Sequence, residues 1–370
     1  MRSQWQQRGL VSWVLRPMSW LYWLVVIIRE SMFRFGFSKT FKPEIPVIVV
    51  GNIYVGGTGK TPVILSLIEA LRARGWHPGL VSRGYGAQAS RDPVCGRGSL
   101  DALRFGDEPA MIALKTGASI AVHPDRVRAV QALMVFDPEV DVVLSDDGLQ
   151  HWRLGRDVEL LVQDERGTGN GLVLPAGPLR EPASRMNRVQ AILTRRPVGE
   201  LRATKADANV LRADFALKVD RFRHLQTGLE VGPGEFVRRI SDSRGVLAVA
   251  GIGVPERFFS DLRSLGVTPS RTLALADHGH IDATWLSEQP EQTILITEKD
   301  AVKLRTTDPS KHLNVKAGST TTNPVKPRSI KLGVADADER IWVGLANSHW
   351  DDEVFFDWLD ALLRNLRTKH

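Results

Sequence analysis

A glycine-rich stretch that ends in a lysine and a threonine carries the most specific chemistry of this sequence. Residues 51–62 read GNIYVGGTGKTP. In such a loop the glycines let backbone N–H groups turn toward phosphate oxygens, the lysine reaches the β- and γ-phosphates, and the threonine hydroxyl binds Mg²⁺. Tyr54 stands where the usual motif has its first glycine. The predicted nucleotide-binding residues are Tyr54, Val55, Gly56, Gly57, Thr58, Gly59, Lys60 and Thr61.

Two pairs of acidic residues follow at places where they could serve such a loop. Asp146 and Asp147 end the apolar run VDVVLSDD, and a carboxylate on a neighbouring strand commonly holds the Mg²⁺ of a phosphate loop. Asp107 and Glu108 lie in FGDEP, before a stretch of helical character. Taken alone, either pair could simply begin a loop or cap a helix.

Two further polar clusters follow apolar runs, where α/β enzymes place their ligands. Arg83 lies in VSRGYG and could stabilise phosphate charge, or it could be a solvated arginine in a turn. Asp277 and His278 lie in LADHGHID. Neither of these two is diagnostic by itself, because a loop histidine is more often an ordinary surface residue.

The elements around the phosphate loop are those that the motif requires. IPVIVVGNI is a continuous β-branched run, typical of a strand buried on both faces. TPVILSLIEALRARG, after the loop, predicts a helix with one apolar face, which Gly75 would end. A strand–loop–helix context is the one in which this motif binds phosphate, so we expect an α/β domain with a parallel sheet.

The N-terminal segment differs in composition from the rest of the chain. Residues 1–42 hold seven of the basic residues against Glu30 alone, although the whole chain has a net charge of +7. The segment also contains four tryptophans and an 11-residue apolar run from Met18 to Ile28. Spanning a bilayer takes about 20 apolar residues, so we expect a helix between Pro17 and Gly36 that lies at an anionic membrane interface. The alternative is a terminal helix packed against its own domain.

Charge and cysteine content exclude other classes of protein. Outside the N-terminal segment the chain of 370 residues is close to neutral, and a nucleic-acid partner would need basic residues along a folded face. Cys95 is the single cysteine, which excludes a disulfide framework and fits a reducing compartment. We therefore expect no nucleic-acid partner.

Taken together, the motifs resemble those of one family. VGNIYVGGTGKTP, VSRGYG, FGDEP, SDDGLQHWRL, LPAGPLREP, AGIGVPERFF, ADHGHID and LITEKDAVKL occur in the order seen in the tetraacyldisaccharide 4′-kinases of lipid A synthesis. LPAGPLREP together with DDGLQHWRL is far more specific than the glycine loop. The resemblance implies transfer of the γ-phosphate of ATP, with Mg²⁺, to the 4′-hydroxyl of a membrane-borne tetraacyldisaccharide 1-phosphate, forming lipid IVA. It also implies a peripheral or monotopic enzyme on the cytoplasmic face of the inner membrane.

The same resemblance implies a domain organisation. It consists of a P-loop NTPase-like parallel-sheet domain and a second, smaller α/β domain, joined by a β-ribbon. The expected ranges are an interfacial helix at 1–36, the kinase domain at 37–213, the ribbon at 214–243 and the second domain at 244–370. An insertion at about 306–340, rich in Ser, Thr, Lys and Pro, departs from the family pattern.

Roles for single residues also follow from the resemblance. Asp107 resembles the base for the sugar hydroxyl and His278 its partner, while Lys60 and Arg83 would act on the transferred phosphate. Thr61, Asp146 and Glu108 would hold the metal. The further expected active-site positions are Asp147, Gln150, His151, Glu181 and Asp277.

Three other functions stay open from the residues alone. A regulatory P-loop ATPase would use the same loop without a catalytic base, and a membrane-tethered nucleotide-binding module would bind ATP without turnover. A kinase for another small sugar would not need the apolar N-terminus. The sequence leaves the oligomeric state and the number and length of the acyl chains undetermined.

Overall fold

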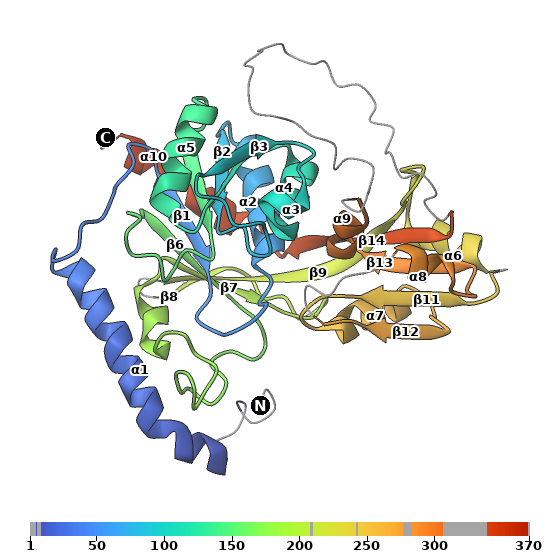
Figure 1. Cartoon of the computed structure of the whole chain (residues 1–370), viewed down its shortest axis with the longest axis horizontal. Coiled ribbons are helices and arrows are strands. Elements are labelled where there is room, and N and C mark those ends of the chain that lie inside the picture. Colours follow the sequence, from blue (N-terminus) through green and yellow to red (C-terminus); the bar gives the residue numbers. More distant parts are fainter. Residues whose placement is uncertain are drawn as a thin grey trace. The chain divides into compact units, whose positions relative to one another are not determined.

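The computed structural model describes residue 5 and residues 9–207, 210–241, 243–276, 283–305 and 339–368. The chain divides into two compact units, which are described separately (Figure 1). The first unit comprises Met1–Lys218 and Asn347–His370, and the second comprises Val219–Ala346. Asp277, His278 and nearly all of the expected insertion at 306–340 lie outside the described residues.

A mainly parallel sheet forms the centre of the first unit. Its strand order is β9-β7-β6-β1-β5-β2-β4-β3, in which β3 runs antiparallel to β4, and β8 pairs antiparallel with β9. The other neighbouring pairs in this order are parallel. The strands are β1 (Val47–Gly51), β2 (Pro78–Ser82), β3 (Val94–Arg97), β4 (Ser119–Val122), β5 (Val142–Asp146), β6 (Val158–Gln163), β7 (Ala191–Arg195), β8 (Lys205–Asp207) and β9 (Val210–His224).

Helices cover both faces of this sheet, as the unbroken apolar run of β1 predicts. Ile48 and Val50 face one core, and Val47 and Val49 face the other. The first core is shared with α2, α4 and α10, and the second with α5 and the loops after β6. The helices of this unit are α1 (Leu10–Arg34), α2 (Lys60–Ala73), α3 (Ala102–Phe105), α4 (Asp107–Thr116), α5 (Arg126–Phe136), the 3₁₀ helix η2 (Ala183–Arg188) and α10 (Val354–Arg367).

Helix α1 is longer than the sequence predicts. It begins at Leu10, so Pro17 lies inside it and not at its start, whereas its end just before Gly36 agrees with the expectation. Its 25 residues, with a mean hydropathy of 1.5 in the most apolar window, are long and apolar enough to cross a membrane by length and composition. The apolar run of 11 residues therefore underestimates the helix, because serines and arginines interrupt the run without ending the helix.

The C-terminal helix belongs to the first unit, whereas the sequence analysis assigned it to the second domain. Phe355, Leu359 and Leu363 of α10 are fully or almost fully buried in the core shared with α2. The indole N–H of Trp76, just after α2, donates to the Asp360 carboxylate at 2.7 Å. The expectation failed because an apolar stripe shows that a helix is buried, but not against which partner.

The second unit is a smaller α/β arrangement. Its parallel strands follow the order β12-β11-β13-β14, and β10 pairs antiparallel with β9. Strands β9 and β14 each run from one unit into the other. The elements are β10 (Glu230–Val231), α6 (Pro233–Ile240), β11 (Val246–Ala250), α7 (Pro255–Ser264), β12 (Arg271–Ala274), α8 (Ala283–Ser287), β13 (Thr293–Thr297), α9 (Glu298–Arg305) and β14 (Ile341–Trp350).

Candidate functional site

The phosphate loop connects the carboxyl end of β1 to the first turn of α2. Asn52, the first residue after β1, donates its side-chain amide to the carbonyls of Tyr54 at 2.7 Å and Gly56 at 3.1 Å. Gly59 has φ +98°, a conformation that favours glycine, directly before α2 begins at Lys60. These features aim the loop's remaining N–H groups and the positive end of α2 at one place, which suits an anion.

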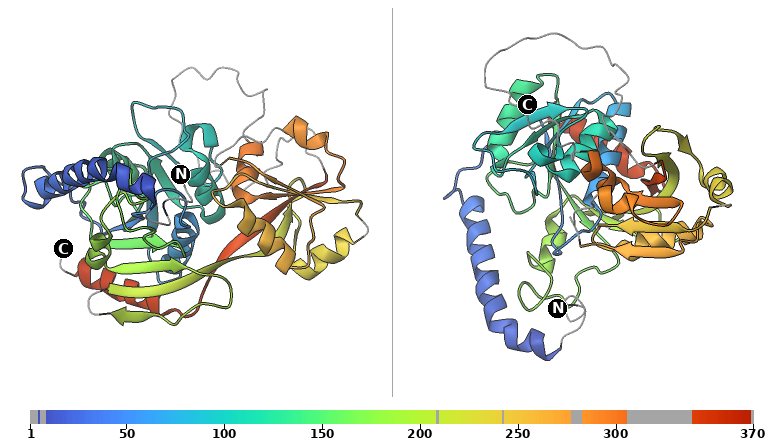
Figure 2. Two further views of the ribbon diagram at one scale, coloured as in Figure 1. Left: turned by 90° about the horizontal axis from the view of Figure 1, so that it is seen from below. Right: turned by 45° about the vertical axis from the view of Figure 1, so that its right-hand side comes forward.

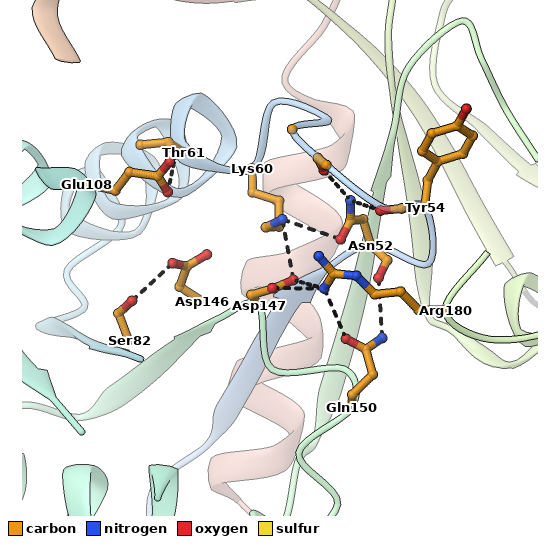
Figure 3. A network of polar contacts seen from close by, with 12 residues as sticks. Asn52, Tyr54, Lys60, Thr61, Ser82, Glu108, Asp146, Asp147, Gln150 and Arg180 are labelled. Carbon is orange, nitrogen blue, oxygen red and sulfur yellow. Dashed lines mark hydrogen bonds and ion pairs between the residues drawn. The ribbon is translucent and has the colours of Figure 1, made fainter. Parts of the chain in front are cut away.

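Lys60 reaches across the loop to a pair of polar partners (Figure 3). Its ammonium lies 3.3 Å from the Asn52 amide oxygen and 3.3 Å from the Asp147 carboxylate. The Arg180 guanidinium donates to the same carboxylate at 2.9 Å. Burial opposes ionisation of Asp147, but Lys60 and Arg180 outweigh it and lower the pKa of this carboxyl. Asp147 is thus held as an anion between two cations.

Asp146 has a different environment, although it adjoins Asp147. It ends β5, where it pairs in register with Val50 of β1, and it accepts a hydrogen bond from the Ser82 hydroxyl at 3.1 Å. Among the described residues its Oδ1 is buried and has no hydrogen-bond partner. Burial, reinforced by the nearby Glu108 carboxylate, raises the pKa of Asp146 to about 6. Lys60 and Arg126 act in the opposite direction but do not outweigh the burial, so a further cation here would favour the ionised carboxylate.

Glu108 and Asp107 reach the site from the first turn of α4. The Thr61 hydroxyl donates to the Glu108 carboxylate at 3.2 Å, so the two helices α2 and α4 meet at their N-terminal ends. Gly106 precedes them with φ +87°, and a β-carbon there would lie 2.7 Å from the Tyr85 carbonyl. This close approach brings the FGDEP loop against the turn that contains Arg83, whose side chain is exposed.

Tyr54 does not take part in the phosphate cradle by its side chain. Its ring is buried and points away from Lys60 (Figure 3), and the Arg166 guanidinium lies 4.4 Å from the ring centroid. Arg166 also donates to the Gly57 carbonyl at 2.7 Å. The N–H of Val55 donates to the Pro178 carbonyl at 2.9 Å, so it is already used. The N–H groups turned to a phosphate are therefore expected from Gly56 onward.

Glu181 and Gln150 lie next to the residues that surround Lys60. The Gln150 amide donates to Glu181 at 2.6 Å and to the Asn52 carbonyl at 3.3 Å. Glu181 is 2% exposed and forms an ion pair with Arg185 at 3.2 Å. Burial raises the pKa of Glu181. Through Gln150 it supports Asn52 at the start of the phosphate loop, and its bonds to Gln150 and Arg185 do not involve the Thr61–Glu108 pair.

His151 lies at a different place from the one its motif suggests. Its Nε2 accepts the backbone N–H of Arg126 at 3.3 Å and lies 3.8 Å from Asp125, at the start of α5. Burial and the nearby Arg126 lower the pKa of His151 to about 4, so the ring is neutral at pH 7. Arg126, which is 4% exposed, donates in turn to the Asp146 carbonyl at 3.1 Å. His151 is therefore joined to Asp146 through Arg126.

The residues present are of the kind that fits Mg²⁺. The oxygens of Asp146, Glu108 and Thr61 are the hard ligands that Mg²⁺ prefers, and Asp146 has an unsatisfied buried oxygen. Within the described ranges no group of three or more His, Cys, Asp or Glu forms a metal cage. Mg²⁺ usually takes one or two carboxylates, with phosphates and waters completing its shell, so a cage is not required.

Four residues of this site were not singled out from the sequence. They are Asn52, Ser82, Arg126 and Arg180. Asn52 could have been found, because a polar side chain directly follows the buried run of β1. Arg180 lies in LPAGPLREP, 120 residues after Lys60, and only the tertiary fold shows which charge it faces.

Comparisons with known proteins agree on one family. A family model described as Tetraacyldisaccharide-1-P 4′-kinase matches residues 11–332. The tetraacyldisaccharide 4′-kinase of Bordetella petrii is 43% identical over 369 residues, covering 98% of this chain and 95% of the relative. That of Ectopseudomonas mendocina is 45% identical over 293 residues, covering 79% and 84%.

One solved structure shares the fold. The crystal structure of LpxK from Aquifex aeolicus in complex with ATP superimposes with a TM-score of 0.72 at 24% identity, covering 96% of this chain and 99% of that one. The expected P-loop NTPase-like fold is therefore confirmed.

Proposed function

The chain belongs to the tetraacyldisaccharide-1-phosphate 4′-kinase family, and on that premise we propose how its own residues serve the reaction. The activity is transfer of the γ-phosphate of ATP to the 4′-hydroxyl of a tetraacyldisaccharide 1-phosphate, a step of lipid A synthesis. The observation that carries the assignment of roles is the cluster of Lys60, Asp147 and Arg180 at the end of β1. A non-catalytic ATP-binding module would not need the separate acidic group at α4.

ATP is held by the loop and by the positive end of α2. The N–H groups from Gly56 to Thr61 surround the phosphates, and the Lys60 ammonium exchanges its contact with Asp147 for the β- and γ-phosphates. Asp147, kept ionised by Arg180, holds Lys60 extended until the nucleotide arrives. Arg83, exposed in its turn, adds positive charge for the transferred group.

Mg²⁺ is expected at Asp146, Glu108 and Thr61. Bound there, the ion would neutralise charge that develops on the phosphates. The donors that this chain supplies are the unsatisfied Oδ1 of Asp146, the Glu108 carboxylate and the Thr61 hydroxyl. A cation at this place would lower the raised pKa of Asp146 by adding positive charge to that of Lys60 and Arg126.

Asp107 is the proposed base for the sugar hydroxyl. It lies in the first turn of α4, one residue before the expected metal ligand Glu108, and is only partly buried. A carboxylate there can orient the 4′-hydroxyl and accept its proton as the phosphoryl group is transferred. The partner role expected for His278 and the active-site position expected for Asp277 remain predictions, since both residues lie outside the described residues. The role of residues 214–243 as a β-ribbon between the two domains also remains a prediction.

The lipid acceptor requires contact with a membrane, and α1 is the element suited to it. The two serines of α1 face the protein, and most of its large apolar side chains face outward, which is the reverse of a helix in water. Ser12 and Ser19 are each 3% exposed, whereas Trp20 and Leu21 are 68% and 66% exposed. The outward residues are Leu10, Val11, Trp13, Val14, Met18, Trp20, Leu21, Trp23, Leu24, Val25, Ile28 and Met32.

The contacts of α1 favour a helix that lies along the membrane over one that crosses it. Asn170 donates to Ser12 near its start, and Arg188 forms an ion pair with Glu30 near its end. Ser12 and Glu30 are 18 residues apart, which corresponds to about 27 Å of helix. The folded unit therefore contacts α1 over most of its length. A polar domain cannot follow a helix through the hydrocarbon core. We therefore expect a monotopic protein on the cytoplasmic leaflet, where ATP is available.

The test is transfer of label from [γ-³²P]ATP to the disaccharide 1-phosphate in detergent, followed by chromatography of the lipid fraction. Wild-type protein should label the lipid, and Asp107→Asn should lose at least about 100-fold in kcat while binding ATP normally. Release of free phosphate without labelled lipid would indicate a regulatory ATPase. Full turnover by Asp107→Asn would remove Asp107 as the base.

A further inference from the structure

The loop from residue 169 to residue 181 has the phosphate loop on one side of it. The Val55 N–H donates to the Pro178 carbonyl at 2.9 Å, and the Arg180 N–H donates to the Ile53 carbonyl at 2.7 Å. Tyr54 and Leu179 form an antiparallel bridge between these two bonds. The backbone of the phosphate loop is thus paired with this segment, which we call the connecting loop.

The same connecting loop has α1 on its other side. Asn170 donates to the Ser12 hydroxyl at 3.2 Å. The Ser19 hydroxyl donates to the Val173 carbonyl and accepts the Ala176 N–H, both at 2.9 Å. Figures 1 and 2 show α1 as a single long helix at the outside of its unit, and these bonds attach it there. The two buried serines of α1 therefore both bond to this one loop.

Arg180 is the residue at which the two sides meet. Its carbonyl accepts the hydroxyl of Tyr22 from α1 at 3.0 Å, and its N–H is bonded to Ile53 of the phosphate loop. Its guanidinium pairs with Asp147, which in turn pairs with Lys60. One residue is thus bonded at its carbonyl to the membrane helix and at its side chain to the carboxylate that holds the phosphate lysine.

We propose that Tyr22 is a positioning residue for phosphoryl transfer, through which the seating of α1 sets the arrangement of the nucleotide site. The proposal rests on the function assigned above and extends it, because α1 then has a second task besides membrane attachment. Fixing the Arg180 backbone fixes the origin of its side chain, and a displaced guanidinium would leave Asp147 and Lys60 less well oriented. Small misplacements of groups that bind a transferring phosphate cost rate steeply.

Tyr22→Phe in the full-length protein tests this link, since it removes one hydroxyl and keeps the ring. Losing a hydrogen bond of this kind should raise the KM for ATP, or lower kcat, by about threefold to tenfold. The KM for the lipid and the sedimentation of the protein with anionic phospholipid vesicles should stay within about twofold of wild type. Ser19→Ala, which removes another α1 hydroxyl that bonds to the connecting loop, should change the ATP parameters in the same direction.

The matched control is Leu21→Gln, which changes the neighbouring residue on the outward face of the same helix. Leu21 is 66% exposed and belongs to the proposed membrane-binding surface. This variant should weaken vesicle binding and raise the KM for the lipid, while the Kd for ATP stays unchanged. The two variants together separate membrane attachment from positioning.

Two outcomes would overturn the proposal. One is a Tyr22→Phe protein with a lowered melting temperature but an unchanged Kd for ATP and unchanged kcat, since the bond would then be structural only. The other is an equal response of the ATP parameters to Leu21→Gln. The ATP titration needs no lipid acceptor, so it reports on Tyr22 even if the wild-type protein phosphorylates nothing, whereas absence of labelled lipid from wild type tests the proposed function alone.

Discussion

Helices α1 and α2 are both apolar, but they bury opposite kinds of side chain. In α2, Ile64, Leu67 and Ile68 are completely buried in the core beneath the sheet. In α1 the most buried side chains are the serines at 12 and 19, and the tryptophans and leucines point outward. The comparison shows that the apolar content of a helix predicts that it is shielded from water. It does not predict whether a protein core or a membrane shields it.

The polar residues of each helix explain the difference. In α2, Lys60 and Thr61 stand at the N-terminus and enter the phosphate site. In α1, Ser12, Ser19 and Tyr22 lie along one side and bond to the connecting loop. Because the polar side of α1 forms its hydrogen bonds with the protein, its apolar side remains available to contact another apolar medium. For an enzyme that modifies a lipid, this medium is the membrane.

The largest effect is expected at the polar end of α2. Lys60→Ala should keep the fold, because the lysine lies outside the apolar core, and should reduce phosphoryl transfer by about 100-fold or more. Removing a charged clamp on the transferred group typically costs about 3 kcal/mol of transition-state stabilisation. Steady-state kinetics with a circular dichroism control measures this. A folded variant with nearly normal turnover would contradict the assigned phosphate site.

The burial contrast itself is tested by two leucine-to-alanine changes. Leu67→Ala in α2 should lower the free energy of unfolding by about 2–5 kcal/mol, because it leaves a cavity in a closed core. Leu21→Ala in α1 should change it by less than about 0.5 kcal/mol in detergent. Urea unfolding of the two variants decides the matter. A comparable loss for Leu21→Ala would mean that α1 completes a core.

Asp146, at the end of β5, should make the free energy of unfolding depend on pH. Folded Asp146 keeps its proton up to about pH 6, whereas the unfolded chain releases it near its usual pKa of 3.8. Folding therefore binds a proton in this window, and stability falls as pH rises from about 4 to about 6. Without nucleotide or Mg²⁺, Asp146→Asn should be up to about 3 kcal/mol more stable than wild type at pH 8 and equal to it below pH 4.

Urea titrations at several pH values measure this difference. A stability gap between the Asp146→Asn variant and wild type that stays constant from pH 4 to pH 8 would show that Asp146 is not the titrating group. Addition of Mg²⁺ with ATP should close the gap at pH 8, because the cation favours the ionised carboxylate.

The smallest effect is expected at the basic residues of α1. Arg29 and Arg34 are exposed, and each should contribute about 1 kcal/mol to binding of anionic vesicles, about fivefold in affinity. Arg29→Gln and Arg34→Gln should lower vesicle affinity by that factor at low salt and by little at 1 M salt. Arg97→Gln, on the edge strand β3, is the control. Equal loss from all three would mean that net charge, and not α1, attracts the membrane.

Much of the first unit could be predicted because its signals are local. The β-branched run of β1, the glycine loop and the periodic face of α2 follow from neighbouring residues, and the structure has these elements in the expected places. The sequence predicted that Asp147 and Lys60 belong to one site, but not that they form an ion pair. That pair depends on β5 lying beside β1. The start of α1 was misplaced because Pro17 is tolerated inside it.

By itself the sequence determined the chemistry of the phosphate loop, the apolar character of both helices and the resemblance to one family. These predictions rest on residues that are close together in the sequence, and such residues stay close together in the folded chain. Only the tertiary structure decided that α10 joins the first unit and that Arg180 links Tyr22 to Asp147. Such contacts join residues 33 to 284 positions apart, and their geometry depends on how the strands are ordered, which no local pattern encodes.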